Sequence, residues 1–150
     1  MAEQNNQILL ETKDLQKHFP IKDFFGRKKQ AVKAVDGITF QIRKGETFGL
    51  VGESGCGKST LGRTLIRMYE PTGGQIIFDG EDITKLEGAK LQPYHKRMQI
   101  IFQDPYSALD PHHNVEEIIR EPMSLYTNAS KSDIDEQIVE LLKKVGMKVD

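Results

Sequence analysis

Eight consecutive residues in the first half of the chain have the types and the spacing of a phosphate-binding loop. They follow the pattern G-x-x-x-x-G-K-[ST] and are Gly52, Glu53, Ser54, Gly55, Cys56, Gly57, Lys58 and Ser59, extended by Thr60. Glycines let successive backbone N–H groups curve toward phosphate oxygens, where a Cβ would block the approach. Lys58 would bring an ammonium group to the β and γ phosphates, and the Ser59 hydroxyl is a hard oxygen ligand of the kind that Mg²⁺ prefers. The sequence therefore predicts a site for a nucleoside triphosphate with Mg²⁺.

The elements predicted on either side of this loop support that interpretation. Residues 47–51 form a short apolar run that is typical of a strand. After the loop, apolar residues recur on one helical face, namely Leu61, Leu65, Met68 and Tyr69. A helix that begins at the loop directs the positive end of its dipole at bound phosphates. The alternative, a glycine-rich turn that binds nothing, does not account for this succession of strand, loop and helix.

Further β-rich segments surround this unit. Three of them, rich in Ile, Val and Phe, predict a small antiparallel sheet near the start of the chain: residues 8–15, 30–35 and 38–42. Residues 75–78 predict another strand, which reverses at Asp79-Gly80 as a tight hairpin does. Residues 98–102 predict one more strand, and after it Pro-containing segments interrupt the pattern.

The last third of the chain predicts helices. A short one covers residues 115–120, and a clearer one presents apolar residues on one face, namely Ile134, Ile138, Leu141, Leu142 and Val145. Either Ser130 with Asp133 or Ser132 with Asp135 would cap the start of the second helix. Gly146 is a natural residue for its C-terminal end.

Composition restricts the class of protein further. The chain has 150 residues, with 21 basic against 22 acidic side chains and a formal net charge of −1, so overall charge gives no attraction to nucleic acid. Its single cysteine, Cys56, excludes an internal disulfide and zinc sites with paired cysteines, which favours a reducing compartment. The longest apolar runs fall far short of the roughly 18 residues of a membrane span. Residues 1–7 are polar and do not resemble a secretory signal.

Several segments together resemble the ATP-binding subunits of ABC transporters, and most closely the branch that imports dipeptides and oligopeptides. The residues that carry the resemblance are Ala34-Val35-Asp36-Gly37, Gly45-Glu46, the loop from Gly52 to Thr60, and Ile101-Phe102-Gln103-Asp104-Pro105 with Ser107, Leu109 and Pro111. The resemblance extends over nearly the whole chain, from about residue 9 to residue 145. It implies ATP as the nucleotide and Mg²⁺ as the metal.

The resemblance also assigns roles to residues outside the loop. Gln103 is similar to the family's Q-loop glutamine, which contacts Mg²⁺ or the attacking water and senses the membrane subunit; its amide both donates and accepts. Lys58 and Gln103 are then the catalytic candidates, and Ser59 and Gln103 the metal ligands. Phe19 is similar to the aromatic residue that stacks on adenine, since stacking needs only a π face. Core packing is the alternative for Phe19, with Phe24 or Phe25 as rival stacking residues.

The hydrolytic machinery of the family also needs a Leu-Ser-Gly-Gly-Gln-like signature, an apolar strand that ends in Asp-Glu, and a later switch histidine. These 150 residues contain none of the three: the apolar runs 76–79 and 100–104 are followed by Gly80 and Pro105, where the general-base glutamate is expected. We therefore expect the N-terminal portion of a longer ATPase, with a β-subdomain and phosphate-loop core at 8–102 and a Q-loop with the start of a helical subdomain at 103–150. The fragment alone is expected to hydrolyse little or no ATP.

The expected fold is thus α/β: an incomplete P-loop NTPase core with an N-terminal antiparallel β-subdomain and the start of an α-helical subdomain. The resemblance implies an ATPase that powers peptide import at the cytoplasmic face of the cell membrane. Its partners would be a second ATPase subunit, two integral membrane permease subunits and, indirectly, an extracellular solute receptor, without nucleic acid. Two alternatives remain at this stage: a non-transport ABC-type ATPase that acts on nucleic acid or the ribosome, and a nucleotide-binding module that does not hydrolyse.

Overall fold

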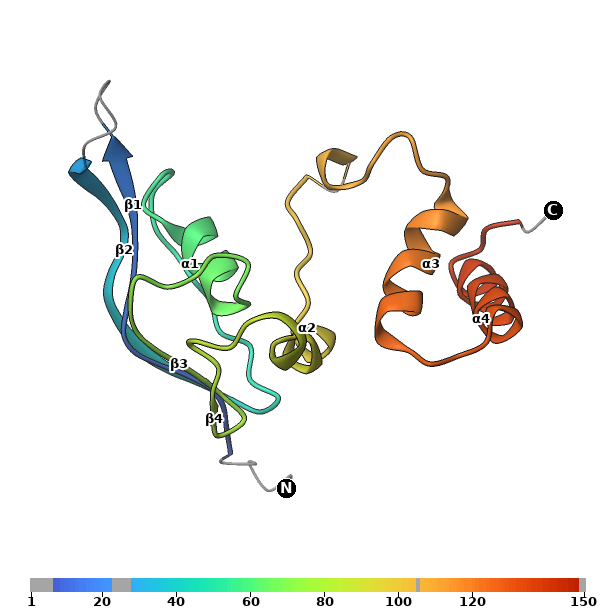
Figure 1. Ribbon diagram of the computed structural model, residues 1–150, viewed down its shortest axis with the longest axis horizontal. Coiled ribbons are helices and arrows are strands. Elements are labelled where there is room, and N and C mark those ends of the chain that lie inside the picture. Colours follow the sequence, from blue (N-terminus) through green and yellow to red (C-terminus); the bar gives the residue numbers. More distant parts are fainter. Residues whose placement is uncertain (1–6, 23–27, 105, 149–150) are drawn as a thin grey trace. The chain divides into compact units, whose positions relative to one another are not determined.

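The computed structural model describes residues 7–22, 28–104 and 106–148, which Figure 1 colours along the chain. These residues form two compact units, which adjoin in the sequence at Met98 and Gln99. The first unit holds the predicted phosphate loop, and the second consists mainly of helices. Within the described residues, every helix is too short or too polar to cross a membrane.

The first unit is built on a four-stranded antiparallel sheet. Its strands are β1 (Ile8–Lys22), β2 (Lys28–Arg43), β3 (Gly73–Phe78) and β4 (Glu81–Asp82), in the spatial order β2-β1-β3-β4. The predicted antiparallel sheet is confirmed, but segments 30–35 and 38–42 are parts of one long strand. Gly37 lies between them at φ +75°, a backbone conformation that glycine adopts without strain, so β2 continues through the local irregularity.

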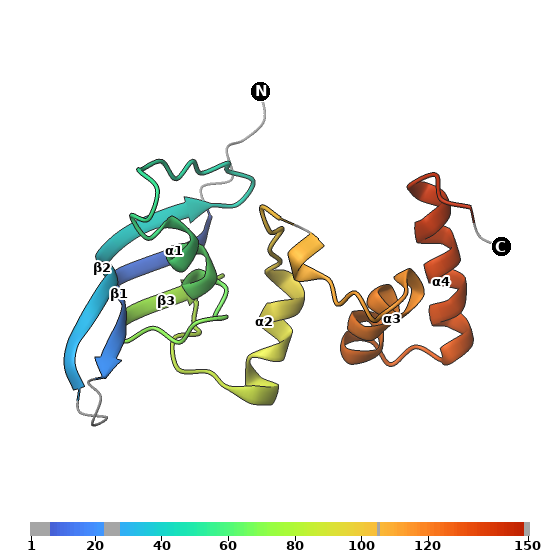
Figure 2. The same ribbon diagram turned by 90° about the horizontal axis from the view of Figure 1, so that it is seen from above.

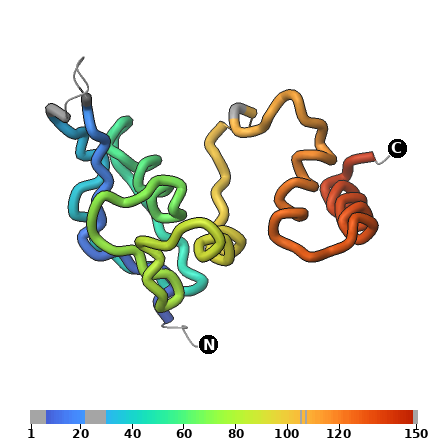
Figure 3. The backbone as a smooth tube through the Cα atoms, in the orientation of Figure 1, coloured from blue at the N-terminus to red at the C-terminus, as the bar shows by residue number. Residues whose placement is uncertain are grey.

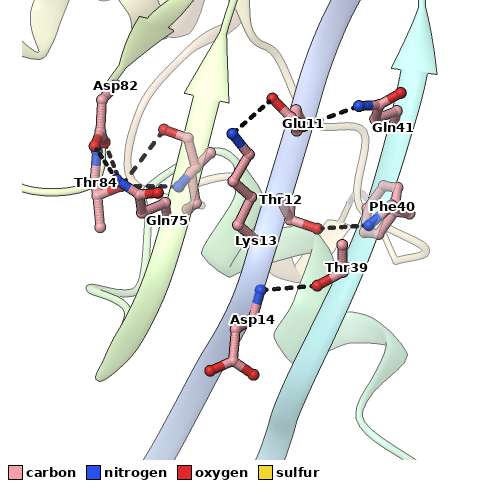
Figure 4. A network of polar contacts seen from close by, with 11 residues as sticks. Glu11, Thr12, Lys13, Asp14, Thr39, Phe40, Gln41, Gln75, Asp82 and Thr84 are labelled. Carbon is pink, nitrogen blue, oxygen red and sulfur yellow. Dashed lines mark hydrogen bonds and ion pairs between the residues drawn. The ribbon is translucent and has the colours of Figure 1, made fainter.

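Side chains in the middle of the sheet fix the register of β1 against β2 (Figure 4). The Phe40 N–H donates to Thr12 Oγ1 at 3.1 Å, and the Asp14 N–H donates to Thr39 Oγ1 at 2.8 Å. Thr12 is fully buried, so this bond also gives its hydroxyl oxygen a partner. Because the register is fixed, the part of β2 that lies next to the phosphate loop is fixed as well.

The turn between β3 and β4 is the predicted hairpin. Asp79 and Gly80 have φ of +52° and +86°, and Phe78 pairs with Glu81 across the turn. Two central residues at positive φ are the signature of the tight turn that Asp-Gly favours. After β4 the chain forms a short 3₁₀ turn, η1 (Gly88–Lys90), and the helix α2 (Gln92–Arg97).

The helix α1 (Lys58–Leu65) begins within the predicted phosphate loop, at Lys58, and lies against one face of the sheet (Figure 2). It contributes to a core whose buried members are Leu15, Val35, Leu61, Ile76, Phe78 and Ile83. The helix is shorter than the apolar periodicity predicts, because Arg67 has φ +61°. The buried Arg67 side chain donates to the carbonyls of Ile83 and Leu86 at 3.1 and 2.9 Å, so tertiary contacts stabilise this end of the helix.

Two strand predictions are wrong for this chain. Residues 47–51 and 98–102 have no regular secondary structure, and Figure 3 follows the first of them as an open trace between β2 and α1. Val51 and Ile101 are 94% and 95% exposed. An apolar, β-branched run favours an extended backbone, but a strand also needs a neighbour to complete its hydrogen bonds. Within the described residues, neither segment has such a neighbour.

The second unit contains a 3₁₀ turn, η2 (Tyr106–Ala108), and the helices α3 (Val115–Tyr126) and α4 (Lys131–Lys144). The helix predicted at 115–120 therefore continues to Tyr126. Asn114 caps α3, and Ser130 with Asp133 forms the capping box of α4, which decides between the two caps predicted for it. Arg120 forms ion pairs with Glu116 and Asp135 and so connects α3 to α4.

Candidate nucleotide site

The predicted phosphate loop is a curved turn that leads into the first turn of α1. Gly55 and Gly57 have φ of +80° and +99°, and Gly57 is the N-cap residue of the helix. The Gly57 carbonyl accepts the first helical hydrogen bond from the Leu61 N–H at 2.8 Å. The backbone amides at the start of α1 are therefore free of helical partners, as an anion site at a helix N-terminus requires.

The phosphate loop packs closely against the middle of β2. A Cβ added to Gly57 would lie 2.1 Å from the carbonyl oxygen of Ala34, well inside contact distance. A Cβ on Gly52 would lie 2.7 Å from Cys56 Sγ, so the loop is also closely packed on itself. Sequence reasoning used Ala34 only as part of a resemblance. Its contact with Gly57 has no local sequence signal, because 23 positions separate the two residues.

Lys58 turns its side chain back to the loop. Its ammonium group donates to the carbonyls of Gly52 at 2.6 Å and Glu53 at 2.5 Å, and Nζ lies 3.5 Å from Cys56 Sγ. The predicted phosphate-binding cation thus lies beside the loop whose amides would share the phosphates. Positive charge and backbone donors converge in one place, which is the electrostatic arrangement that a triphosphate needs.

A cavity of about 350 Å³ adjoins the loop on the side of β2, and both elements line it. Its charged lining residues are Lys33, Asp36 and Lys58. Asp36 accepts hydrogen bonds from Lys33 Nζ at 3.0 Å and pairs with His18 Nε2 at 2.8 Å. The hydrogen bond from Lys33, and then that from His18, keeps the pKa of Asp36 below its usual value, so its carboxyl group stays ionised. Two ammonium groups against one carboxylate leave this side of the loop positive.

The other predicted site residues lie in different surroundings. Ser59 and Thr60 are in the first turn of α1, and the exposed Ser59 hydroxyl fits a magnesium ligand that works beside phosphate oxygens. Phe19 lies near the end of β1, with its ring centroid 5.6 Å from that of Tyr69. Gln103 is exposed in a bend of the second unit, whereas the loop belongs to the first. Phe24 and Phe25 lie outside the described residues.

The described residues hold no cluster of three or more His, Cys, Asp or Glu side chains that could bind a metal by itself. A magnesium ion at this loop would therefore depend on the phosphates for several of its ligands. That arrangement is common for Mg²⁺, which usually takes one or two protein ligands together with phosphates and waters.

Comparison with known families identifies the family of this chain. The family model described as ABC transporter matches residues 35–150, which include the whole phosphate loop. The chain belongs to the ABC transporter family. The resemblance found in the sequence is thereby confirmed, as is the assignment to an incomplete P-loop NTPase α/β fold.

The names of two relatives of this ABC transporter chain refer to peptide transport. It is 47% identical over 149 residues to the oligopeptide transport ATP-binding protein AppF of Bacillus subtilis, covering 98% of this chain and 45% of that protein. It is 40% identical over 144 residues to the dipeptide transport ATP-binding protein DppF of Escherichia coli, covering 96% of this chain and 43% of that protein. The chain thus spans less than half the length of these relatives.

Solved structures of ABC cassettes share the fold. The ATP-binding cassette MJ0796, solved as a dimer in a post-hydrolysis state with ADP and Pi, matches with a TM-score of 0.74 at 22% identity, over 93% of this chain and 58% of that one. The protein cbiO1 from Clostridium perfringens, described as part of an ABC transporter complex, matches with a TM-score of 0.65 at 23% identity, over 95% of this chain and 52% of that one. At these identities the likeness concerns the arrangement of the backbone.

Proposed function

We propose that this chain supplies the phosphate-loop half of an MgATP site in the ATP-binding subunit of a peptide importer. The observation that carries the proposal is the loop itself. Its backbone curves at glycines with positive φ, and the N-terminus of α1 and the Lys58 ammonium group lie in the same place. The names of the relatives, which refer to transport of oligopeptides and dipeptides, support the choice of cargo class.

The chemistry proposed for the site is transfer of the γ-phosphoryl group to water. Loop amides would hold the β and γ phosphates, and the Lys58 ammonium group would offset the negative charge that moves onto their oxygens. Ser59 and Gln103 would hold the metal, and the amide of Gln103 would also orient the attacking water. When bound, Mg²⁺ would offset the negative charge of the phosphates.

The assembly proposed for the full-length protein contains several subunits. ATP would lie between the phosphate loop of one subunit and the signature motif of a second ATPase subunit, and the dimeric state of a solved cassette of this fold supports such pairing. Two membrane permease subunits would carry the peptide, and a receptor outside the cell would deliver it. In such an assembly the protein would lie at the cytoplasmic face of the membrane. Co-purification with integral membrane subunits would support a role in transport. Co-purification with nucleic acid or ribosomes would instead favour a non-transport ABC-type ATPase.

The direct test is calorimetry on the full-length protein with MgATP and with magnesium tripolyphosphate. Binding of both ligands, with ATP the tighter of the two, supports a phosphate loop with an adjoining base site. No heat with either ligand would remove the basis of the proposal.

Hydrolysis by the 150-residue chain alone should stay at the level of the buffer, because these residues lack the signature motif and the general-base glutamate. A typical enzyme turns over about 10 times per second, so phosphate release is a sensitive measurement. The full-length protein assembled with its partner subunits is the positive control. Turnover by the short chain at an ordinary enzymatic rate would contradict the assignment of the missing parts.

A bulky maleimide on Cys56 should block nucleotide binding, because the exposed thiol lies in the loop and 3.5 Å from Lys58 Nζ. Bound ATP should in turn protect the thiol. At ATP about 100 times above its Kd, only about 1% of sites are empty, so labelling should slow by roughly 100-fold. Peptide mapping of the labelled full-length protein measures this, and Cys56→Ser provides an unlabelled control of similar size. Equal labelling rates with and without ATP would count against the site.

A further inference from the structure

The segment that follows α1, residues 68–72, is hydrogen-bonded to the last part of β1. The Thr72 N–H donates to the Gln16 carbonyl at 2.8 Å, and the His18 N–H donates to Thr72 Oγ1 at 3.0 Å. The Lys17 ammonium group donates to the Glu70 carbonyl at 2.8 Å. These contacts hold residues 68–72 beside residues 16–19, so the far end of α1 is tied to the strand that carries Phe19.

The Tyr69 ring links the segment after α1 to β1. The Phe19 and Tyr69 rings meet edge to face, with centroids 5.6 Å apart and planes at 88°. Lys17 Nζ lies over both rings, 5.0 Å from the centroid of Phe19 and 5.7 Å from that of Tyr69. An edge-to-face pair under a shared cation has defined geometry, because the ring faces are negative and the ring edges and the ammonium group are positive.

Tyr69 also contacts α1, the helix that starts at the phosphate loop. Arg63, in the last turn of α1, donates from Nη1 to the Tyr69 hydroxyl at 3.2 Å, and its guanidinium carbon lies 5.9 Å from the ring centroid. One helix therefore begins with Lys58 and carries in its last turn the arginine that bonds to Tyr69. The chain of contacts Lys58–α1–Arg63–Tyr69–Phe19 joins the phosphate end of the proposed site to its base end.

We infer that Tyr69 is a positioning residue that holds the Phe19 ring at a fixed place relative to the phosphate loop, so that a nucleotide gripped at its phosphates meets the ring with its base. The inference rests on the proposed function and on Phe19 as the base-stacking residue. It goes beyond core packing of Phe19, because packing alone would not make the effect of Tyr69 depend on whether the ligand has a base.

The test compares two ligands that share their phosphates and differ in the base. Full-length protein with Tyr69→Ala is titrated with MgATP and with magnesium tripolyphosphate. Loss of one edge-to-face contact corresponds to roughly threefold to tenfold in affinity, so ATP should weaken by that factor while tripolyphosphate binds as before. Tyr69→Phe keeps the ring and should keep ATP affinity within about twofold. Adding Tyr69→Ala to Phe19→Ala should cause little further loss of ATP affinity, because the two substitutions remove the same interaction.

Tyr94 provides the matched control. Its ring also meets a phenylalanine edge to face, with the centroid of Phe78 at 6.3 Å and planes at 80°, but neither of these two residues is among those proposed to bind the nucleotide. Tyr94→Ala should lower the melting temperature and leave the ratio of ATP to tripolyphosphate affinity unchanged. If Tyr69→Ala does not fold, Tyr69→Leu keeps apolar volume without the ring and is measured in the same way.

The outcomes are distinct. An unchanged ratio of ATP to tripolyphosphate affinity in Tyr69→Ala or Tyr69→Leu, including equal weakening of both ligands, overturns the inference and leaves the proposed function in place. Selective weakening of ATP that Tyr69→Phe restores supports the inference. Failure of the unaltered protein to bind either ligand would instead overturn the proposed function, and the inference with it.

Discussion

Replacing Lys58 with alanine should lower the affinity of the full-length protein for MgATP by at least about 100-fold. A hydrogen bond from a charged group contributes about 1.5–3 kcal/mol, and the ammonium group is expected to contact two phosphates, so a loss of about 3 kcal/mol follows. Calorimetry on the variant measures the loss directly. Lys90→Ala, an exposed lysine of η1 in the same unit, should leave the affinity unchanged.

The same substitution should have little effect on stability. In the described structure the Lys58 ammonium group bonds to the carbonyls of Gly52 and Glu53, and both bonds are exposed, so water can replace the donor. A thermal melt of Lys58→Ala within a few degrees of the unaltered protein, together with lost ATP binding, would locate the effect in ligand recognition. Retention of ATP affinity within threefold would contradict the role given to Lys58.

Features that are decided within a few residues could be predicted from the sequence. The phosphate-loop pattern, the Asp79-Gly80 turn and a capped start of α4 each depend on neighbours in the chain, although the choice of Ser130 over Ser132 as the cap came from the structure. In each case the residue type satisfies a local requirement: positive φ at the turn, or an acceptor for an unpaired amide at the helix start. The family resemblance, which extends such local patterns over the chain, was confirmed for the same reason.

Features that depend on distant partners could not be predicted. Residues 47–51 have the composition of a strand, yet only a neighbouring strand would make them one, and the described residues supply none. The end of α1 is set by Arg67, whose side chain bonds to carbonyls 16 and 19 positions further on. The contact of Ala34 with Gly57 and that of Phe19 with Tyr69 likewise join segments far apart in the sequence. For the candidate site, the loop was visible in the sequence and its supports were not.

Gly57→Ala should abolish nucleotide binding and destabilise the first unit, which follows from the support that β2 gives to the loop. The new Cβ would lie 2.1 Å from the Ala34 carbonyl oxygen, and the backbone fixes the positions of both atoms, so no side-chain rotation can relieve the clash. The φ of +99° adds strain of about 1–3 kcal/mol for a residue with a side chain. Together with the displaced backbone, we expect a loss of about 3 kcal/mol or more in the free energy of unfolding, seen as a lower urea midpoint.

Two neighbouring glycines separate the causes of this effect. Gly55 has φ +80° with nothing within 4 Å of its would-be Cβ, so Gly55→Ala should cost only the strain, about 1–3 kcal/mol. Gly62 lies inside α1 with open space around its would-be Cβ, so Gly62→Ala should stabilise the protein by about 0.5–1 kcal/mol through helix propensity. The expected order of urea midpoints is therefore Gly62→Ala above the unaltered protein, then Gly55→Ala, then Gly57→Ala. A Gly57→Ala variant as stable as Gly55→Ala would show that β2 does not support the loop, because the contact with Ala34 is the difference between the two positions.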